Sequence, residues 1–373
     1  MIIFEQKQKI IAMKLSHSLT IMAVAAAFAL TSCGGAKRTE QFVNGSLPRE
    51  ATPLSIQEAV DAVLAEDAAN KAVKFESLMI LKHGKVIFED WYGNAAPDKP
   101  HAMHSVSKSF TATAVGMCVD EGLLKVTDKL VDFFPDNLPE EVSDNLAACT
   151  VYDLLTMNCG QESSPDYRKT KEEWVTAFLA EPFVHEPGTW YYYNTLGTYM
   201  LSAIVTKVTG QKVLDYLTPR LFEPLCIEIP FWEESPQGIN AGGYGLEIKT
   251  EDMAKFGQLF LQKGMWDGKQ LVSAEWVEEA SKYQVPSVPA GTRPDNAAER
   301  GLTPENCTFM LGYGYQMWRC PDNAYRADGA RGQYIMVIPD SDAVVACTAD
   351  TENLQAEQDL IYKYIFPALA ALD

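Results

Sequence analysis

Apolar positions near the start of the chain recur first with the period of a helix and then with that of strands. The stretch Ser55-Ile56-Gln57-Glu58 has the pattern of a capping box, and the apolar residues Ile56, Val60, Val63 and Leu64 share one helix face. Residues 77–81 and 86–92 then flank a His83-Gly84 turn. This pattern predicts a helix followed by an antiparallel hairpin.

Helical spacing dominates the middle of the chain, and strand-like runs return at its end. Between residues 123 and 242 the clearest helical segments are 151–157, 174–179 and 195–208. Thr250 is expected to cap an amphipathic helix, and a second helix contains Trp276. A Pro- and Ala-rich loop over 286–306 precedes strand-like runs at 312–319, 333–338 and 343–348, and a final helix covers 352–369.

These elements predict an α+β fold. Strands at both ends of the chain favour one antiparallel sheet flanked by helices, an α/β/α sandwich. The residues between them favour an inserted all-helical lobe at about 123–242. We expect the folded domain to span residues 51–373 and to be a monomer.

The first 50 residues are expected to be a targeting segment and a tether. Lys14 provides a positive start, residues 19–30 form an apolar stretch too short for a comfortable membrane span, and Leu30-Thr31-Ser32-Cys33 resembles the bacterial lipobox. Residues 1–33 are therefore interpreted as a lipoprotein signal with Cys33 as the lipidated residue, and residues 34–50 as the tether. The alternative is a plain secretory signal with an incidental cysteine. We expect a lipid-anchored protein of the bacterial cell envelope, on its periplasmic face or at the cell surface.

Charge and cysteine content limit the classes of partner. With 31 Lys and Arg against 50 Asp and Glu, the formal net charge is −19. Such a charge disfavours nucleic acids and anionic membrane surfaces as partners, so membrane contact is expected only through the anchor. The chain has no C-x-x-C motif or Cys/His cluster, and we expect no metal and no other cofactor. Of the cysteines other than Cys33, Cys307 and Cys320 are the favoured disulfide pair.

A serine and a lysine three residues apart are the first candidates for chemistry. Ser105 precedes a helical pattern that ends near Gly122, so Ser105 and Lys108 would share one helix face. A serine hydroxyl becomes a nucleophile when a neighbour takes its proton, and a desolvated lysine can do so. Free N–H groups at the helix start could also hold an oxyanion. The competing interpretation is an N-cap serine beside a solvated lysine.

A second constellation lies further along, in the run Pro187-Gly188-Thr189-Trp190-Tyr191-Tyr192-Tyr193-Asn194. Tyr192-Tyr193-Asn194 matches a Tyr-x-Asn motif. A Ser-x-x-Lys followed by this motif resembles the serine β-lactamase-related family, especially class C β-lactamases and their esterase and peptidase relatives. The resemblance covers about residues 60–366 and includes the Gly242-Gly243 pair.

The resemblance implies a role for each of these residues. Ser105 would be the nucleophile, and Tyr192 would shuttle its proton if the charge of Lys108 lowers the pKa of the phenol. Asn194 would hydrogen-bond the lysine or the substrate. The alternative for the tyrosines is an aromatic run that packs against a helix start. Two similar patterns, at 92–94 and 143–145, are interpreted as a turn and a helix cap.

The third motif of the family is where this sequence departs from it. The family has Lys-Thr-Gly or His-x-Gly on a late strand, and this chain has Ala327-Asp328-Gly329-Ala330. Gly329 would let a substrate lie close to the strand, and the N–H of Ala330 would be the second oxyanion donor beside that of Ser105. Ala327 stands where the family has a cationic lysine or histidine. In the family that cation recognises the carboxylate of a β-lactam or a D-alanyl terminus.

These observations favour a serine hydrolase that acts through an acyl-enzyme on an ester or amide, a small molecule or a peptide, other than a conventional β-lactam. One alternative is a D,D-peptidase or β-lactamase in which Arg331 or Arg326 replaces the missing cation. Arg331 would serve only if strand alternation continues to it. A third possibility is a catalytically silent fold that acts as an envelope-binding lipoprotein. The retained Ser105, Lys108, Tyr192 and Asn194 speak against it.

Overall fold

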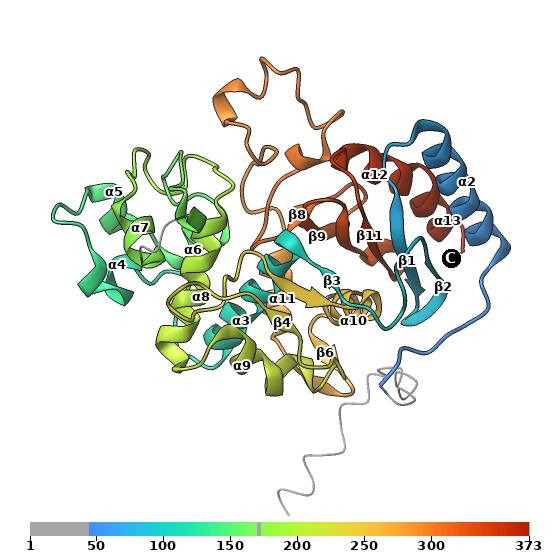
Figure 1. Ribbon diagram of the computed structural model, residues 1–373, viewed down its shortest axis with the longest axis horizontal. Coiled ribbons are helices and arrows are strands. Elements are labelled where there is room, and N and C mark those ends of the chain that lie inside the picture. Colours follow the sequence, from blue (N-terminus) through green and yellow to red (C-terminus); the bar gives the residue numbers. More distant parts are fainter. Residues whose placement is uncertain (1–44, 170–172, 373) are drawn as a thin grey trace, which may run out of the picture. The chain divides into compact units, whose positions relative to one another are not determined.

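The computed structural model describes residues 45–169 and 173–372 (Figure 1). The chain divides after Thr39 into two units, and all described residues belong to the second, Glu40–Asp373, which is compact. The expected signal segment with its lipobox at Cys33, and most of the expected tether, lie outside the described residues. Within the described part of the chain, no helix combines the length and the apolar character needed to cross a bilayer.

The centre of the second unit is a six-stranded antiparallel sheet with the order β2-β1-β11-β10-β9-β8. Met79 of the first strand lies opposite Ala346 of the last, so the early hairpin pairs with the C-terminal strands. The prediction of one antiparallel sheet built from both ends of the chain is confirmed. The strands are β1 (Phe75–Lys82), β2 (Lys85–Trp91), β8 (Trp318–Arg319), β9 (Tyr325–Gly329), β10 (Gln333–Ile338) and β11 (Ala343–Ala349).

Helices cover both faces of this sheet, as the predicted sandwich requires. One face carries α2 (Leu54–Asn70), α12 (Leu354–Leu360) and α13 (Phe366–Ala370), the last two joined by the π-helical segment Ile361–Ile365. The other face carries α10 (Thr250–Leu261). A Cβ atom on Gly257 of α10 would lie 2.6 Å from Val344 Cγ1, so only glycine allows this close an approach of helix to sheet.

The middle of the chain forms a helical lobe beside the sheet, coloured green in Figure 1. The helix α3 (Ser107–Asp120) connects the two parts: it packs against α8 of the lobe, and its Phe110 stacks on Phe256 of α10 with ring centroids 4.0 Å apart. The start of α3 is therefore fixed where lobe and sheet meet. The lobe helices are α4 (Leu130–Phe133), α5 (Asp144–Ala148), α6 (Val151–Leu155), α7 (Trp174–Ala180), α8 (Thr195–Thr209) and α9 (Val213–Leu217).

Short elements complete the second unit. Three strands form a small antiparallel sheet of order β3-β5-β4, and two others form a hairpin. The expected loop over 286–306 contains a single 3-10 turn, Pro294–Asn296, and no strand. The remaining elements are β3 (His101–Ala102), β4 (Phe231–Trp232), β5 (Leu246–Ile248), β6 (Met265–Trp266), β7 (Lys269–Gln270) and α11 (Ala274–Ser281).

The expected strand over 312–319 is wrong for most of its length. Only Trp318–Arg319 is a strand, because Gly312 and Gln316 have φ angles of 113° and 58°, which interrupt an extended backbone. Gln316 instead holds the lobe together, because its Nε2 atom donates hydrogen bonds to Leu154 O at 3.1 Å and Leu155 O at 2.9 Å.

Two helix starts also differ from the prediction. Helix α2 begins at Leu54 after Pro53, so Ser55 lies inside the first turn and caps nothing. Helix α10 has Lys249 at its N-cap, and the Thr250 hydroxyl hydrogen-bonds Ser77 Oγ at 2.8 Å. The helix cap expected at residues 143–145 is confirmed, because Ser143 Oγ accepts a hydrogen bond from the N–H of Leu146 and caps α5.

The expected disulfide between Cys307 and Cys320 is absent. All seven cysteines of the described residues are free thiols. Cys320 Sγ lies 3.4 Å from Arg326 Nη1 and accepts a hydrogen bond from it. Cys320 therefore belongs to the polar surroundings of a buried arginine rather than to a covalent crosslink.

Candidate active site

Ser105 and Lys108 face each other across one helical turn. Ser105 lies in the 3-10 turn His104–Val106, which leads into α3, and Lys108 follows in the first turn of that helix. Lys108 Nζ lies 3.1 Å from Ser105 Oγ. The serine is partly exposed, whereas only 1% of the lysine surface is accessible. A solvated lysine beside an N-cap serine is therefore not what the chain forms.

The residue before the serine has an uncommon backbone conformation. His104 has φ +46°, in the left-handed region that costs energy for a residue with a side chain. Its carbonyl accepts a hydrogen bond from Ser107 Oγ at 2.7 Å, which holds the turn. Burial lowers the pKa of the His104 imidazole, and the charges of Arg331 and Arg168 lower it further. His104 is thus neutral near pH 7 and brings no charge to the serine.

Burial makes Lys108 a candidate general base. Its pKa falls from 10.5 to about 7, first through burial and then through the charge of Arg168, while Asp328 opposes the shift. Lys108 Nζ also lies 2.7 Å from Gly243 O and 3.2 Å from Thr195 Oγ1. A neutral amine has two N–H donors and one lone pair. When the carbonyl and the threonine hydroxyl accept the two N–H groups, the lone pair is left for the proton of Ser105.

The Gly243 carbonyl is held in place by close packing around it. Thr111 Oγ1 of α3 donates to Gly242 O at 2.8 Å, which fastens this loop to the helix that carries Lys108. A Cβ atom on Gly243 would lie 2.8 Å from Thr195 Cγ2 and 3.3 Å from Lys108 Nζ. Glycine is required here because a side chain would push the carbonyl away from the amine.

Tyr193, not Tyr192, reaches the serine. Tyr193 hydrogen-bonds the side chain of Ser105, and Lys108 Nζ lies 5.1 Å from the centre of its ring. Burial raises the pKa of the Tyr193 phenol, so it is protonated at neutral pH; the bond to Ser105 only partly opposes this shift. Tyr192 is half-buried and faces Glu181 and Cys159, and burial raises the pKa of its phenol too.

Backbone alternation explains which tyrosine points where. Side chains of successive residues in an extended segment point to opposite sides. Tyr191 and Tyr193 accordingly pack against the same residue, Trp318, with ring centroids 6.1 Å and 5.6 Å away, and Tyr192 points elsewhere. Aromatic packing alone describes Tyr191, whereas Tyr193 both stacks on Trp318 and hydrogen-bonds the nucleophile through its hydroxyl.

Asn194 caps helix α8, so its expected contact with the lysine is not formed. Its Oδ1 atom accepts from the N–H groups of Leu196 and Gly197 at 3.0 Å and 3.2 Å, and its Nδ2 donates to Gln161 Oε1 at 2.8 Å. The next residue, Thr195, is the one that meets Lys108. The pattern at the site is therefore Tyr193-x-Thr195, one residue later than the sequence suggested.

A helix-start signal could have resolved this frame. Asparagine directly before an apolar helical run is a preferred N-cap. The side-chain oxygen of an N-cap residue accepts hydrogen bonds from the N–H groups of the first helical turn. That oxygen is then unavailable to a lysine across the site. Three consecutive tyrosines allowed two frames, and the cap signal at Asn194 favours the later one.

The N–H groups expected to form an oxyanion hole belong to two segments in close contact. A Cβ atom on Gly329, at the end of β9, would lie 2.4 Å from Met103 O and 3.3 Å from Val106 Cγ2. Gly329 thus lets the strand end lie against the turn that carries Ser105. Among the described residues, neither the Ser105 nor the Ala330 N–H donates a hydrogen bond. Both donors can therefore serve a developing negative charge.

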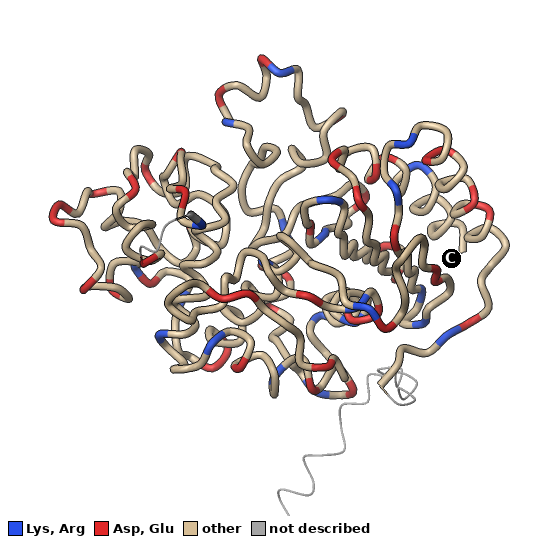
Figure 2. Tube along the Cα trace, viewed as in Figure 1, with Lys and Arg blue, Asp and Glu red and all other residues tan. Residues whose placement is uncertain are grey.

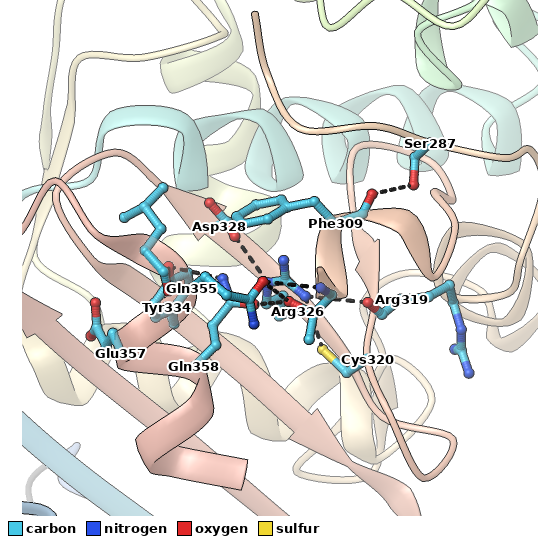
Figure 3. Close-up of polar contacts among 12 residues, drawn as sticks. Ser287, Phe309, Arg319, Cys320, Arg326, Asp328, Tyr334, Gln355, Glu357 and Gln358 are labelled. Atoms are coloured by element: carbon cyan, nitrogen blue, oxygen red, sulfur yellow. Dashed lines mark hydrogen bonds and ion pairs between the residues drawn. The ribbon is translucent and has the colours of Figure 1, made fainter. Parts of the chain in front are cut away.

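Arg326 cannot replace the missing cation of the third motif, because it is completely buried. Figure 3 shows Arg326 and Asp328 on the same side of β9. Arg326 Nε donates to Asp328 Oδ2 at 2.9 Å, and the guanidinium lies 4.7 Å from the centre of the Phe309 ring. Burial raises the pKa of Asp328 to about 6 against the opposing charge of Arg326. Ala327 faces the opposite side, towards the core beneath α10.

Arg331 does not continue the strand either. Strand β9 ends at Gly329, and Arg331 has φ +66° in the turn that follows. Its guanidinium forms an ion pair with Asp350, which also binds Lys74 Nζ at 2.8 Å. The condition under which Arg331 would serve, that strand alternation continues to it, is therefore not met, because the turn interrupts the alternation.

Comparisons with known sequences identify the family of the chain. The Beta-lactamase family model matches residues 60–369. The 6-aminohexanoate-dimer hydrolase of Paenarthrobacter ureafaciens is 26% identical over 293 residues, which cover 72% of this chain and 71% of that protein. Protein flp of Staphylococcus aureus (strain MW2) is 23% identical over 249 residues, 61% of this chain. Those residues cover 49% of Protein flp, so the match spans about half of its length.

Solved structures show the same fold. A putative 6-aminohexanoate-dimer hydrolase from Bacillus anthracis superposes with a TM-score of 0.70 and 16% identity over 90% of this chain and 88% of that one. The octameric penicillin-binding protein homologue from Pyrococcus abyssi gives a TM-score of 0.65 and 20% identity, over 83% and 77%. Because the family model matches most of this chain and the relatives include proteins named as hydrolases, the chain belongs to the Beta-lactamase family and is a serine hydrolase.

Proposed function

We propose that the protein hydrolyses an ester or amide through an acyl-enzyme on Ser105, with Lys108 as the general base and Tyr193 as a proton donor. The observation that carries this proposal is the 3.1 Å contact between Ser105 Oγ and a buried amine whose pKa lies near 7. A base with a pKa close to the working pH combines a useful neutral fraction with enough basicity to accept the proton.

Acylation begins with transfer of the Ser105 proton to neutral Lys108 while Oγ bonds to the substrate carbonyl carbon. The carbonyl oxygen becomes an oxyanion that accepts hydrogen bonds from the N–H groups of Ser105 and Ala330. Collapse of this intermediate breaks the bond to the leaving group, and the phenol of Tyr193 protonates the departing oxygen or nitrogen. The proton on Lys108 then restores the phenol.

Deacylation repeats these steps with water as the nucleophile. Lys108, neutral again, takes a proton from the water as its oxygen attacks the acyl carbon. The bond from the acyl carbon to Ser105 Oγ breaks, the proton on Lys108 passes to Oγ, and the acid is released. The raised pKa of Tyr193 suits a donor rather than a phenolate base, which differs from the role implied for Tyr192.

We propose a substrate other than a conventional β-lactam. The support is the third motif: Ala327 replaces the cation, Arg326 is buried against Asp328, and Arg331 is paired with Asp350. The similarity to a protein named 6-aminohexanoate-dimer hydrolase favours a linear amide as one substrate type. An amide is consistent with the proton donor at Tyr193, because a departing nitrogen needs a proton.

Hydrolysis of 4-nitrophenyl acetate, followed with mass spectrometry of the trapped enzyme, tests this function. We expect turnover with an acetyl group on Ser105 and a loss of at least about a thousandfold in Ser105→Ala, as for other nucleophile knockouts. A chromogenic cephalosporin should be turned over far more slowly. Undiminished activity in Ser105→Ala, or acylation at another residue, would overturn the proposal.

We also propose that the protein is exported and anchored by a lipid on Cys33, supported by the apolar stretch 19–30 and the lipobox-like Leu30-Thr31-Ser32-Cys33. Metabolic labelling of a bacterial host with an alkyne fatty acid tests this. We expect label in the envelope fraction for the natural sequence and none for Cys33→Ser. Equal labelling of both would contradict a lipid at Cys33.

A further inference from the structure

Arg168 is an exposed arginine beside the site whose charge has no acidic partner among the described residues. It belongs to the 3-10 turn Tyr167–Lys169 of the helical lobe. Its guanidinium lies 4.0 Å from the centre of the Tyr244 ring and 5.8 Å from that of Tyr167, and it hydrogen-bonds both side chains. Stacking of this kind orients the planar guanidinium, and of its five N–H groups those that the two tyrosines do not accept are left for a ligand.

Tyr244 connects this arginine to the catalytic centre. It directly follows Gly243, whose carbonyl accepts the 2.7 Å hydrogen bond from Lys108. The Trp232 indole N–H donates to Tyr244 O at 3.0 Å and fixes the backbone of this loop. The positive charge of Arg168 also lowers the pKa of Lys108 and that of His104, which lie on either side of Ser105 in the sequence. Arg168 therefore approaches the nucleophile from the lobe, whereas β9 approaches it from the sheet.

Arg168 differs from the other arginines near the site, because its guanidinium forms no ion pair with a carboxylate of the described residues. The two arginines near the third motif are both neutralised, Arg326 by Asp328 and Arg331 by Asp350. The chain carries a net charge of −19, and Figure 2 shows acidic residues along both the lobe and the sheet region. The mean field of such a protein repels anions, so an anionic substrate needs a local positive charge at the site.

We propose that Arg168 binds a carboxylate of the substrate, so that this hydrolase prefers esters or amides that carry a carboxylate near the scissile bond. This inference rests on the proposed function at Ser105 and names the substrate class of that same site. Arg168 provides a cation on the lobe side of Ser105. A carboxylate bound there would have a different position from that of a β-lactam, whose carboxylate is recognised from the strand that carries Ala327. Its planar guanidinium can form two parallel N–H···O bonds with a carboxylate.

Two matched pairs of substrates test the preference on both sides of the scissile bond. The acyl-side pair is mono-4-nitrophenyl glutarate and its methyl ester, and the leaving-group pair is 4-acetoxybenzoate and its methyl ester. The measured quantity is the ratio of kcat/KM for the anion to that for the neutral partner. This ratio cancels any change in Lys108 basicity that follows removal of the Arg168 charge.

We expect a ratio above one for at least one pair in the natural sequence. In Arg168→Gln that ratio should fall by about 10- to 100-fold, because a hydrogen bond to a charged group is lost, while activity on the neutral partner changes far less. Arg168→Lys should lie between the two. The preference should also weaken at high ionic strength.

Arg220→Gln is the matched control. Arg220 also lies 4.0 Å from the centre of a tyrosine ring, that of Tyr216, but its charge is paired with Glu121 at 2.8 Å. This variant should leave both ratios unchanged. Ratios that stay the same in Arg168→Gln for both pairs would overturn the role of Arg168, while turnover of the neutral esters that depends on Ser105 would leave the proposed function standing. If no substrate is turned over and Ser105 is not acylated, the proposed function fails and this inference fails with it.

Discussion

Neighbouring tyrosines in this chain have different surroundings because an extended backbone turns successive side chains to opposite sides. Tyr193 meets Ser105, and Tyr192 faces Glu181 and Cys159. The same shift of one residue separates Asn194, which caps α8, from Thr195, which contacts Lys108. Single residues in this run are therefore distinguishable by their contacts, although their side chains are chemically alike.

The substitutions Tyr193→Phe and Tyr192→Phe separate these two tyrosines. Each removes one hydroxyl from a phenol. We expect kcat/KM for an amide substrate to fall by about 10²–10⁴ in Tyr193→Phe, the usual contribution of a proton-transfer group, and to change only a few-fold in Tyr192→Phe. Steady-state kinetics check both. A larger loss in Tyr192→Phe than in Tyr193→Phe would show that the frame of the motif is wrong.

At the scale of elements, the site depends on loops and helix starts that approach one another closely. The 240–243 loop meets α3 and α8 through hydroxyl groups, and Thr111 and Ser202 donate to the carbonyls of Gly242 and Asn240 at 2.8 Å and 2.7 Å. The Gly243 carbonyl and the Lys108 amine are thereby held together. Catalytic geometry of this kind is sensitive to displacements of about an ångström.

The variant Gly243→Ala tests this packing. The added methyl group would lie 2.8 Å from Thr195 Cγ2 and 3.3 Å from Lys108 Nζ, so loop or lysine must move. We expect at least about a hundredfold loss in kcat, consistent with a displacement of about an ångström, in a protein that remains folded by circular dichroism. Gly197→Ala in the first turn of α8 is the control, because its Cβ meets neighbours at an ordinary 3.7 Å. Equal activity of the two variants would contradict a positioning role for the Gly243 carbonyl.

The sequence predicted elements well where periodicity is strong and less well where single conformations decide. The β1–β2 hairpin, α8 and α10 follow clear periods of two or 3.6. The strand expected from 312 was interrupted by Gln316, whose conformation serves its bonds to the lobe. The low pKa of Lys108 and the position of Arg168 could not be predicted. The burial of Lys108 and the approach of Arg168 from the helical lobe both depend on tertiary packing.

At the scale of the whole molecule, the two ends of the second unit are joined in one sheet, and the nucleophile helix rests on the helix that covers it. Met79 pairs with Ala346, and α10 lies on β10 and β11 through Gly257. The position of Ser105 relative to β9 therefore depends on the integrity of the core beneath α10. Stability and activity are linked through this core.

The pair Ile335→Ala and Ile229→Ala measures that dependence. Ile335 is 1% exposed, and its Cγ2 atom would lie 2.8 Å from a Cβ on Gly257, whereas Ile229 is 66% exposed. We expect Ile335→Ala to lower the free energy of unfolding by about 2–5 kcal/mol, the cost of a buried cavity, and Ile229→Ala to have little effect. Urea unfolding checks both. Equal midpoints would mean that the core does not pack against α10 as described.

The pH dependence of Ser105 modification by a fluorophosphonate probe, with the labelled peptide identified by mass spectrometry, tests most directly whether a neutral Lys108 activates the serine. Protonated Lys108 has no lone pair, and its pKa is lowered to about 7 mainly by burial. The rate constant should therefore rise about tenfold per pH unit below 7 and become constant above about pH 8. Ser105 should carry the label. A rate that keeps rising towards the usual lysine pKa of 10.5, or a label on another residue, would contradict Lys108 as the base.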